Sequence, residues 1–375
     1  MMRRTVGRSD SRTGPRLVAA LFLSVSLTVR LSGQDSQFSM RGLGVPGRWE
    51  SVRARTTGGA FGPFDPRSSV ADVSLTDALQ LTATAAEATT YRRAEIGGSR
   101  DDLRSSRFPF MGLAGPLSRR FVVGGGFATY LDRTYSIVTR DSQMLRGAYA
   151  PYTDRIGSDG AVADLRFAAA ARLRSWLAIG AGAHVLSGSS RQTAQRIYDD
   201  TTFLGTTQTA VVRYDGFGIS GSVALDPVPA VRILGYARSD NRLRTRLGDT
   251  ETDRTDLPTT LGAAVRWSPS PSARVAGTVM WRSWSDAGGF NTTSWSAGAE
   301  VGAGPTPLRF GVRGGQLPFG PGTVAPTELG VTLGTGKGFS GNRALVDLGL
   351  ERLVRTGGGL TETAWTVLVG LTIRP

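Results

Sequence analysis

The sequence predicts an all-β fold, a closed antiparallel β-barrel of about 14 strands that crosses a membrane. Apolar and polar residues alternate with a period of two along most of the chain, and a strand places successive side chains on opposite faces. After residue 34, no apolar run reaches the roughly 18 residues of a membrane-spanning helix. Strands whose two faces meet lipid and an aqueous interior explain both observations.

The first 34 residues read as a signal peptide. Five arginines up to Arg16 precede the apolar run LVAALFLSVSLTV over 17–29, which is short for a membrane helix and suits the core of an export signal. We expect cleavage near Gly33 or Gln34, which leads to export. An exported membrane barrel is expected in the outer membrane. There we expect the barrel-assembly machinery to fold it, and lipid and lipopolysaccharide to surround it.

Fourteen segments qualify as strands in chain order. The first seven cover residues 75–91, 108–117, 120–139, 160–173, 177–186, 211–226 and 231–240. The second seven cover residues 257–267, 273–284, 293–302, 308–313, 327–335, 343–354 and 360–373. The last is the clearest, because Trp365, Val367 and Val369 alternate with polar or small residues. An even strand number keeps both termini on one side.

The connections alternate in length. Short turns are predicted at residues 117–119, 173–176, 227–230, 268–272 and 303–307, and long polar loops at 139–159, 187–210 and 240–256. Barrels of the outer membrane have short periplasmic turns and longer extracellular loops. We therefore expect Arg174, Pro229 and Pro271 in the periplasm, and Gln195, Asp199 and Asp253 at the cell surface.

The alternation separates an apolar register from a charged one. The apolar register includes Leu165, Phe167, Ile179, Val265, Phe310, Leu333 and Leu348, which we assign to lipid. The opposite register carries the predicted lumen charges Asp164, Arg166, Arg238, Arg282, Arg309, Arg313, Glu328 and Asp347. An arginine facing lipid at mid-membrane would cost roughly 2 to 4 kcal/mol, so these groups belong inside. We expect Asp347 and Glu328 to offset Arg309 and Arg313.

Composition argues against several function classes. The net charge of +14 falls to +9 without the first 34 residues, and the remaining arginines are spread singly, which disfavours nucleic-acid binding. The chain has no cysteine and one histidine, His184, so a thiol or histidine-rich metal site is not expected, nor any cofactor. His184 falls on the interior register without a fixed acid partner in the sequence. We expect no enzyme. A soluble all-β sandwich is the competing fold.

The stretch RARTTGGAFGPFDPRSSVADVSL over 53–75 does not alternate. It resembles the amino-terminal hatch of the FadL-like outer-membrane transporters, a family that includes the PorV-type barrels. The matching residues are Gly58, Gly59, Ala60, Phe61, Phe64 and Asp65, with Ser68 and Ser69 in the turn. Ala71, Asp72 and Val73 stand where the family shows Asn-Pro-Ala. The resemblance implies a hatch over 35–74 that plugs the lumen of a barrel over 75–375.

The glycine pair also carries a physical prediction. Glycine adopts positive φ readily, so Gly58 and Gly59 would let the backbone turn and approach the barrel wall closely. Phe61 and Phe64 would then fill an apolar gap. Gly124, Gly125 and Gly126 lie inside the third predicted strand, and glycine there often marks a bulge. The FadL-like family has a kink in its third strand that opens sideways, so the resemblance makes this triplet the lateral-opening candidate.

The resemblance implies passive uptake of small, hydrophobic, fatty-acid-like molecules across the outer membrane. Two alternatives stay open: a PorV-like scaffold that binds protein partners, and a general porin for polar solutes. The polar stretch 187–210 argues against a strict fatty-acid specialist, because the family uses the corresponding loop to form a hydrophobic groove.

Overall fold

A computed structural model describes residues 36–96, 99–302 and 306–375 of the chain. The predicted signal peptide lies outside these residues. Within them, no helix is long and apolar enough to cross a membrane. Instead, strands of up to 27 residues follow one another in antiparallel pairs.

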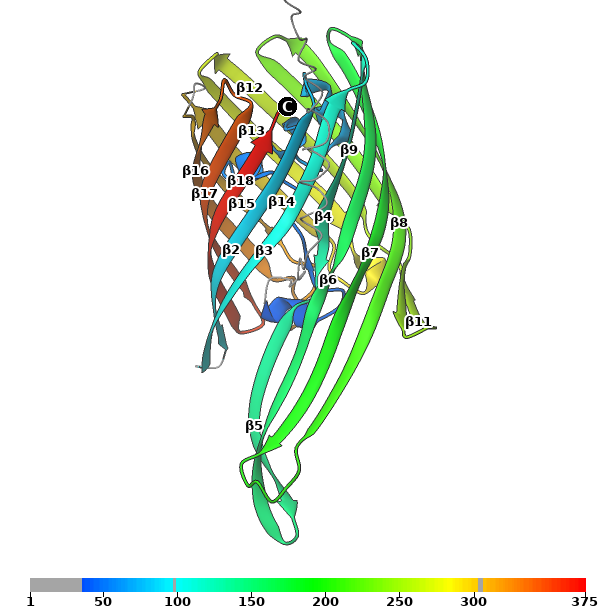
Figure 1. Ribbon diagram of the computed structural model, residues 1–375, viewed down its shortest axis with the longest axis vertical. Coiled ribbons are helices and arrows are strands. Elements are labelled where there is room, and N and C mark those ends of the chain that lie inside the picture. The colour runs from blue at the N-terminus through cyan, green and yellow to red at the C-terminus, as the bar shows by residue number, and fades with distance from the viewer. Residues whose placement is uncertain (1–35, 97–98, 303–305) are drawn as a thin grey trace, which may run out of the picture. The chain divides into compact units, whose positions relative to one another are not determined.

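Fourteen strands form the wall of a closed barrel (Figure 1). The first seven are β2 (Thr82–Ile96), β3 (Ser99–Pro116), β4 (Phe121–Asp132), β6 (Ala148–Arg174), β7 (Leu177–Tyr198), β8 (Thr206–Val228) and β9 (Val231–Asp240). The second seven are β12 (Thr259–Ser270), β13 (Ala273–Ser283), β14 (Thr292–Val301), β15 (Leu308–Gln316), β16 (Thr327–Phe339), β17 (Ala344–Gly357) and β18 (Leu360–Ile373). Closure comes from β18 pairing with β2, from Leu360 opposite Ile96 to Ile373 opposite Ala83. The predicted strand number and the antiparallel order of neighbouring strands are confirmed.

The two faces of the wall follow the predicted registers. Along β18, burial alternates strictly, with Trp365, Val367 and Val369 exposed and Glu362 and Thr366 buried. The assigned lipid-facing residues Leu165, Phe167, Ile179, Val265, Phe310, Leu333 and Leu348 are all exposed on the outside. Lumen-facing arginines and carboxylates are buried instead. A soluble sandwich would bury its apolar register, so the reversed burial excludes that alternative.

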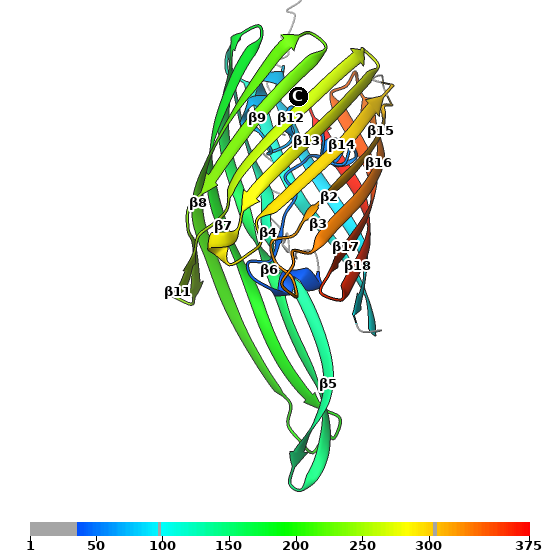
Figure 2. The same cartoon turned by 180° about the vertical axis from the view of Figure 1, so that it is seen from behind.

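Three predicted loops are strands in the structure. β6, β7 and β8 continue well beyond the barrel and are joined by β5 (Tyr135–Leu145), while β10 (Leu243–Leu247) and β11 (Thr250–Thr255) form a second hairpin (Figures 1 and 2). The prediction of loops over 139–159, 187–210 and 240–256 was therefore wrong. Outside the membrane neither strand face needs apolar residues, so the hydrophobic alternation ends although the backbone ladder continues.

The N-terminal part of the described chain runs inside the barrel. This inner segment, residues 36–78, contains η1 (Gln37–Met40), β1 (Val45–Pro46), α2 (Val52–Arg55), η2 (Gly62–Phe64) and η3 (Asp72–Asp77). Most of it is buried against lumen-facing side chains, and β1 pairs with β4.

The first wall strand begins later than predicted, at Thr82 rather than Leu75. The hydroxyls of Ser74 and Thr76 donate to the carbonyl oxygens of Ala71 and Val73, at 2.7 and 2.8 Å. Such local side-chain bonds compete with a strand ladder. They hold residues 72–77 as the 3₁₀ helix η3 within the inner segment.

Topology gives a first prediction. The C-terminus lies at the barrel end with the short turns, opposite the β5–β8 extension (Figure 1). Pro229→Cys places a thiol in a short turn, and Asp199→Cys places one at the far end. On intact cells we expect maleimide to label position 199 and not position 229, because position 229 would face the periplasm. The chain has no native thiol, so each variant reports without background. Labelling of intact cells at 229 but not 199 would reverse the orientation.

Candidate functional site

Ion pairs fix the middle of the inner segment to one side of the wall. Arg53 of α2 donates two hydrogen bonds to Glu300 of β14, both at 2.9 Å. Arg67 pairs with Asp347 of β17 at 2.9 Å. Arg309 of β15 lies between the two carboxylates, 2.8 Å from Glu300 and 2.6 Å from Asp347. The predicted pairing of Asp347 with Arg309 is present, and it includes the inner segment.

Asp65 organises the turn between these anchors. Its carboxylate accepts hydrogen bonds from Ser51 Oγ at 2.8 Å and from Arg67 Nε at 3.1 Å. Burial alone would raise the pKa of Asp65, but the charges of Arg67 and Arg53, with these hydrogen bonds, hold that pKa well below its usual range. The ionised Asp65 carboxylate therefore stabilises the fold at any pH above 3.8, the ordinary pKa of an aspartate. This stabilisation is lost only as the pH falls below that value.

Gly58 makes the close approach to the wall that was predicted for it, and Gly59 turns the chain beside Glu50 of the inner segment. Both have positive φ, at +69° and +96°. A Cβ on Gly58 would lie 2.6 Å from the carbonyl oxygen of Val312 in the wall, and the Gly58 amide donates to Thr332 Oγ1 at 2.8 Å. Ala60, Phe61 and Phe64 are buried beside it in one apolar cluster. Larger residues at 58 would force the segment off the wall.

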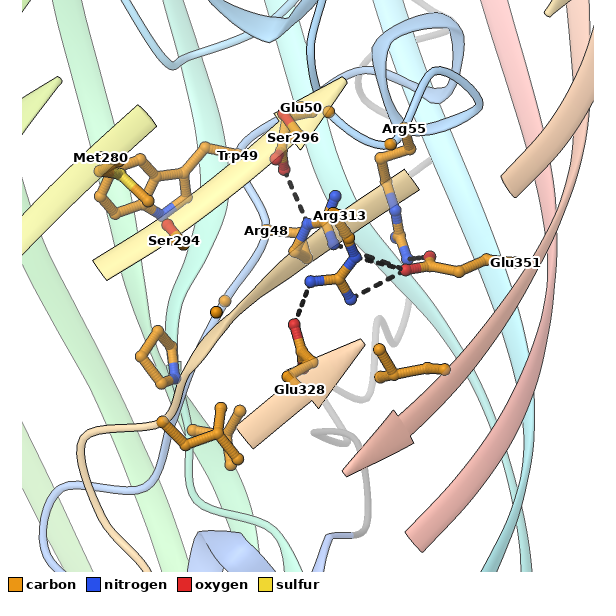
Figure 3. A pocket seen from close by; sticks show the side chains of 18 of the residues that line it. Arg48, Trp49, Glu50, Arg55, Met280, Ser294, Ser296, Arg313, Glu328 and Glu351 are labelled. Atoms are coloured by element: carbon orange, nitrogen blue, oxygen red, sulfur yellow. Dashed lines mark hydrogen bonds and ion pairs between the residues drawn. The ribbon is translucent and has the colours of Figure 1, made fainter. Parts of the chain in front are cut away.

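A cavity of about 160 Å³ lies between the inner segment and the wall. Inner-segment residues Arg48, Trp49, Glu50 and Arg55 line one side, and Arg313, Glu328 and Glu351 line the other (Figure 3). Arg282 of β13 also lines the cavity. Met280, Leu317 and Leu353 add apolar surface. The walls are thus mixed, with an aliphatic and aromatic part and a charged part.

Arginines outnumber carboxylates around the cavity. Glu351 accepts from Arg55 at 2.6 Å and pairs with Arg313 at 2.9 Å, while Glu328 pairs with Arg313 and with Arg355. Figure 3 shows the guanidinium groups of Arg55 and Arg313 directed at Glu351, and that of Arg313 also at Glu328. Among the described residues, Arg48 Nη2, Arg55 Nη1, Arg282 Nε and Trp49 Nε1 have no acceptor. The cavity therefore offers buried donors to an acceptor-rich ligand.

The cavity extends to a break in the wall between β3 and β4. Their pairing stops at Phe110 opposite Ala128, and beyond that point β4 pairs with β1 of the inner segment instead. Arg107 and Pro109 line the cavity from the β3 side, and Thr129 and Asp132 line it from the β4 side. The two strands thus separate in the half of the barrel nearer the long extension.

Local sequence explains the break. Pro109 has no backbone N–H to donate to a neighbouring strand. β3 bulges there, because Phe110 lies opposite Ala86 and Arg107 opposite Ala88. β4 bulges at Tyr130, since Thr129 and Leu131 face consecutive residues of β6. Each bulge bends its strand locally. Pro109 was the sequence signal, and it was missed.

Gly124, Gly125 and Gly126 do not interrupt their strand. All three are paired with β3 on one side and β6 on the other. A Cβ on Gly124 would lie 2.7 Å from Leu75 Cδ2, and one on Gly126 would lie 3.4 Å from Ser69 Oγ. Gly124 and Gly126 therefore make room for the inner segment, and the strand separation begins beyond the triplet.

His184 has partners that the sequence did not reveal. Its Nδ1 lies 2.9 Å from Asp164 Oδ1 on β6, and its Nε2 lies 2.8 Å from Ser220 Oγ on β8. This order is that of a serine-hydrolase triad. However, the same hydroxyl also contacts Asp72 of η3 at 2.7 Å, so a carboxylate occupies the space where a substrate would approach. The site couples the wall to the inner segment.

The remaining predicted lumen charges join the same networks. Arg166 pairs with Asp72 at 2.9 Å, and Arg238 pairs with Asp164 at 2.5 Å and with Asp240 at 2.8 Å. Arg282 stacks over Trp49, with 4.5 Å between the guanidinium carbon and the ring centroid. Within the described parts of the chain, no group of three or more His, Cys, Asp or Glu side chains could hold a metal ion.

Comparisons with known proteins agree with this architecture. No family model and no curated protein matches the chain. Among solved structures, a Pseudomonas aeruginosa FadL homologue superposes with a TM-score of 0.62 at 13% identity, covering 89% of this chain and 100% of that one.

Two further structures are similar. The P. putida toluene transporter TodX gives a TM-score of 0.60 at 14% identity, covering 90% of this chain and 99% of that one. The CymD monoaromatic hydrocarbon channel gives 0.59 at 14% identity, with coverage of 90% and 99%. The chain therefore has the fold of the FadL-like channels, as its N-terminal segment predicted.

Proposed function

We propose that this protein is an outer-membrane channel for passive uptake of small hydrophobic molecules that carry an acceptor-rich head group, such as fatty-acid-like carboxylates. The observation that carries the proposal is the cavity between the inner segment and the wall. Its apolar residues suit a hydrocarbon body, and its unpaired buried donors suit a carboxylate. The solved channels with this fold include transporters of toluene and other monoaromatic hydrocarbons.

The break between β3 and β4 suggests a route. A solute that enters from the side of the long extension would reach the cavity, and the strand separation beside Arg107 and Thr129 offers an exit into the membrane. The inner segment fills the lumen on the other side of the cavity, with η3 packed against β6, β7 and β8. A lateral route avoids moving an apolar solute through the charged network.

Arg282→Met tests the head-group assignment. The binding to be measured is that of a fluorescently labelled long-chain fatty acid and of the matched fatty alcohol, by titration of the purified protein. A hydrogen bond to a charged group contributes about 1.5 to 3 kcal/mol, so the substitution should weaken acid binding by about tenfold or more and leave alcohol binding nearly unchanged.

Arg274→Met is the matched control. Arg274 lies on the same strand, β13, but does not line the cavity, and its pairing with Glu300 is loose at 3.7 Å. This control should bind both ligands as the unmodified protein does. Equal affinity of the unmodified protein for acid and alcohol would contradict the head-group assignment.

The scaffold alternative has one supporting observation. The extension formed by β5 to β8 carries exposed apolar side chains, among them Val138, Met144 and Tyr149, which could contact a protein partner. A scaffold needs no solute site in the lumen. Absence of binding by either labelled ligand would therefore favour this second function.

A further inference from the structure

A chain of four side chains links the barrel wall to the inner segment. Asp164 on β6 contacts His184 Nδ1, His184 Nε2 contacts Ser220 Oγ on β8, and Ser220 Oγ contacts Asp72 Oδ2 of η3. The three distances are 2.9, 2.8 and 2.7 Å. His184 and Asp164 are each 1% exposed and Asp72 is 2% exposed. Each contact in such a buried chain needs a proton donor.

Counting protons shows what the chain requires. Two ionised carboxylates end it, and both can only accept. The Ser220 hydroxyl has a single proton, which can go to Asp72 or to His184 but not to both. If it goes to Asp72, then His184 must donate from both ring nitrogens, to Asp164 and to Ser220. All three hydrogen bonds therefore exist together only when the ring is an imidazolium, or when a carboxylate is protonated instead.

The surrounding charges favour the imidazolium. The groups joined to this chain by ion pairs are Arg166 of β6, which contacts Asp72, and Arg238 of β9, which contacts Asp164 and Asp240. Among the groups that pair directly with this chain, three carboxylates face two guanidinium groups, and a protonated His184 balances the charge of that set. Tyr130 of β4 donates to Asp240 at 2.8 Å and stays neutral. Arg282 of β13 stacks on Trp49 and pairs with none of these carboxylates among the described contacts.

We propose that His184 is a proton latch that holds η3 of the inner segment against the wall. With His184 protonated, the hydrogen-bond chain is complete and the local charge is balanced. Loss of that proton removes one hydrogen bond and leaves a net negative charge that disfavours the Asp72 carboxylate there. The start of η3, at Asp72 and Val73, should then separate from β7 and β8 more readily as the pH rises, while Asp77 at its other end stays paired with Arg232 at 2.6 Å. Which solute the barrel carries does not enter this inference.

The packing makes η3 suited to such control. Apart from the hydrogen-bond chain and the contact of Asp72 with Arg166, the start of η3 is held by the Val73 amide, which donates to Ser222 Oγ at 2.8 Å. A Cβ on Gly180 would lie 2.4 Å from the Val73 nitrogen, and one on Gly182 would lie 2.8 Å from Asp72 Oδ1. The wall and η3 thus meet in direct contact, and a small displacement breaks the chain.

The test measures access to η3 directly. Val73→Cys introduces a single thiol at a position that is 1% exposed, in a chain without native cysteine. The reference is Ser118→Cys, whose thiol lies in an exposed turn. The labelling ratio is the maleimide labelling rate of Val73→Cys in proteoliposomes divided by that of Ser118→Cys. We measure this ratio from about pH 6 to 9, the range around histidine titration. We expect the ratio to rise reversibly, by at most about tenfold per pH unit, the limit for one linked proton.

Two variants in the Val73→Cys background assign the effect. His184→Gln cannot titrate, so its ratio should not change with pH. Asp72→Asn supplies the missing donor, because its amide can donate to Ser220 while the hydroxyl donates to neutral His184. The labelling ratio of this variant should stay low up to the highest pH. If Asp72 had only a structural role, its substitution would expose η3 and raise the ratio at every pH.

Some results would overturn the proposal. A constant ratio in the His184 parent would show that no titrating group controls η3. The same slope in His184→Gln as in the parent would assign the proton to another group. Heat-modifiable migration of each variant on gels checks that the barrel is folded. The Val73→Cys parent tests the proposal without the other two variants, because a constant ratio in the parent already contradicts it. The proposal therefore stays testable even if one of those variants misfolds.

Discussion

Deletion of residues 35–66 is expected to leave a folded barrel that conducts ions as an open pore. A barrel of 14 strands encloses more space than its own side chains fill, so single-channel conductance should rise by about an order of magnitude or more when the filling segment is removed. The deletion removes Gly58, which lies directly against Val312 of the wall, and Phe61, which is buried in a cluster with wall residues. The measurement is conductance in planar bilayers, beside the full-length protein.

Heat-modifiable migration is the control for folding, because the wall strands pair with one another independently of residues 35–66, β1 apart. A truncated protein that migrates as unfolded would say nothing about conductance. If the full-length barrel already conducts ions as freely as the truncation, the inner segment does not act as a plug. The general porin would then replace the proposed selective channel.

Asp347→Leu should destabilise the barrel strongly. Asp347 is 3% exposed and pairs with both Arg67 and Arg309, so its loss leaves two buried guanidinium groups short of a partner. Removing one member of a buried ion pair costs about 3 to 5 kcal/mol. The free energy of unfolding, from denaturant titration in detergent micelles, should fall by that order. Loosening of the inner segment should accompany it.

Leu348→Ala is the neighbouring control. Leu348 is 48% exposed on the lipid-facing side, so the truncation should cost only about 1 to 2 kcal/mol, part of the burial energy of a leucine. A similar loss for both variants would mean that the ion-pair network contributes little to stability. The pair of substitutions thus compares adjacent residues on opposite faces of one strand.

On the proposed function, one lumen holds both a charged network and a site for a solute with an apolar body. The ion pairs Arg53 with Glu300 and Arg67 with Asp347 occupy the part of the lumen where the inner segment contacts β14 to β17. The cavity lies between that region and the break where β3 leaves β4. The apolar body of such a solute would contact Met280, Leu317 and Leu353, and its head group would contact the guanidinium groups that line the same cavity.

Much of the fold could be predicted from local pattern. The alternation of Trp365, Val367 and Val369 fixes the faces of the closing strand, because the side-chain period of a strand is two. The positive φ of Gly58 and Gly59 follows from the absence of a Cβ. The strand extensions could not be predicted in this way, since polar residues on both faces carry no periodic signal.

The sequence by itself determined the barrel, its strand number, its lipid face and the charged register of its lumen, because each follows from neighbours one or two positions apart. Only the tertiary structure decided which charges meet. Asp164, His184 and Ser220 lie on three adjacent strands, and Asp72 reaches them from a segment with no repeating pattern. The break beside Pro109 likewise depends on bulges in two strands and on β1 replacing β3. Such contacts depend on strand register and on the path of the inner segment, which no local pattern encodes.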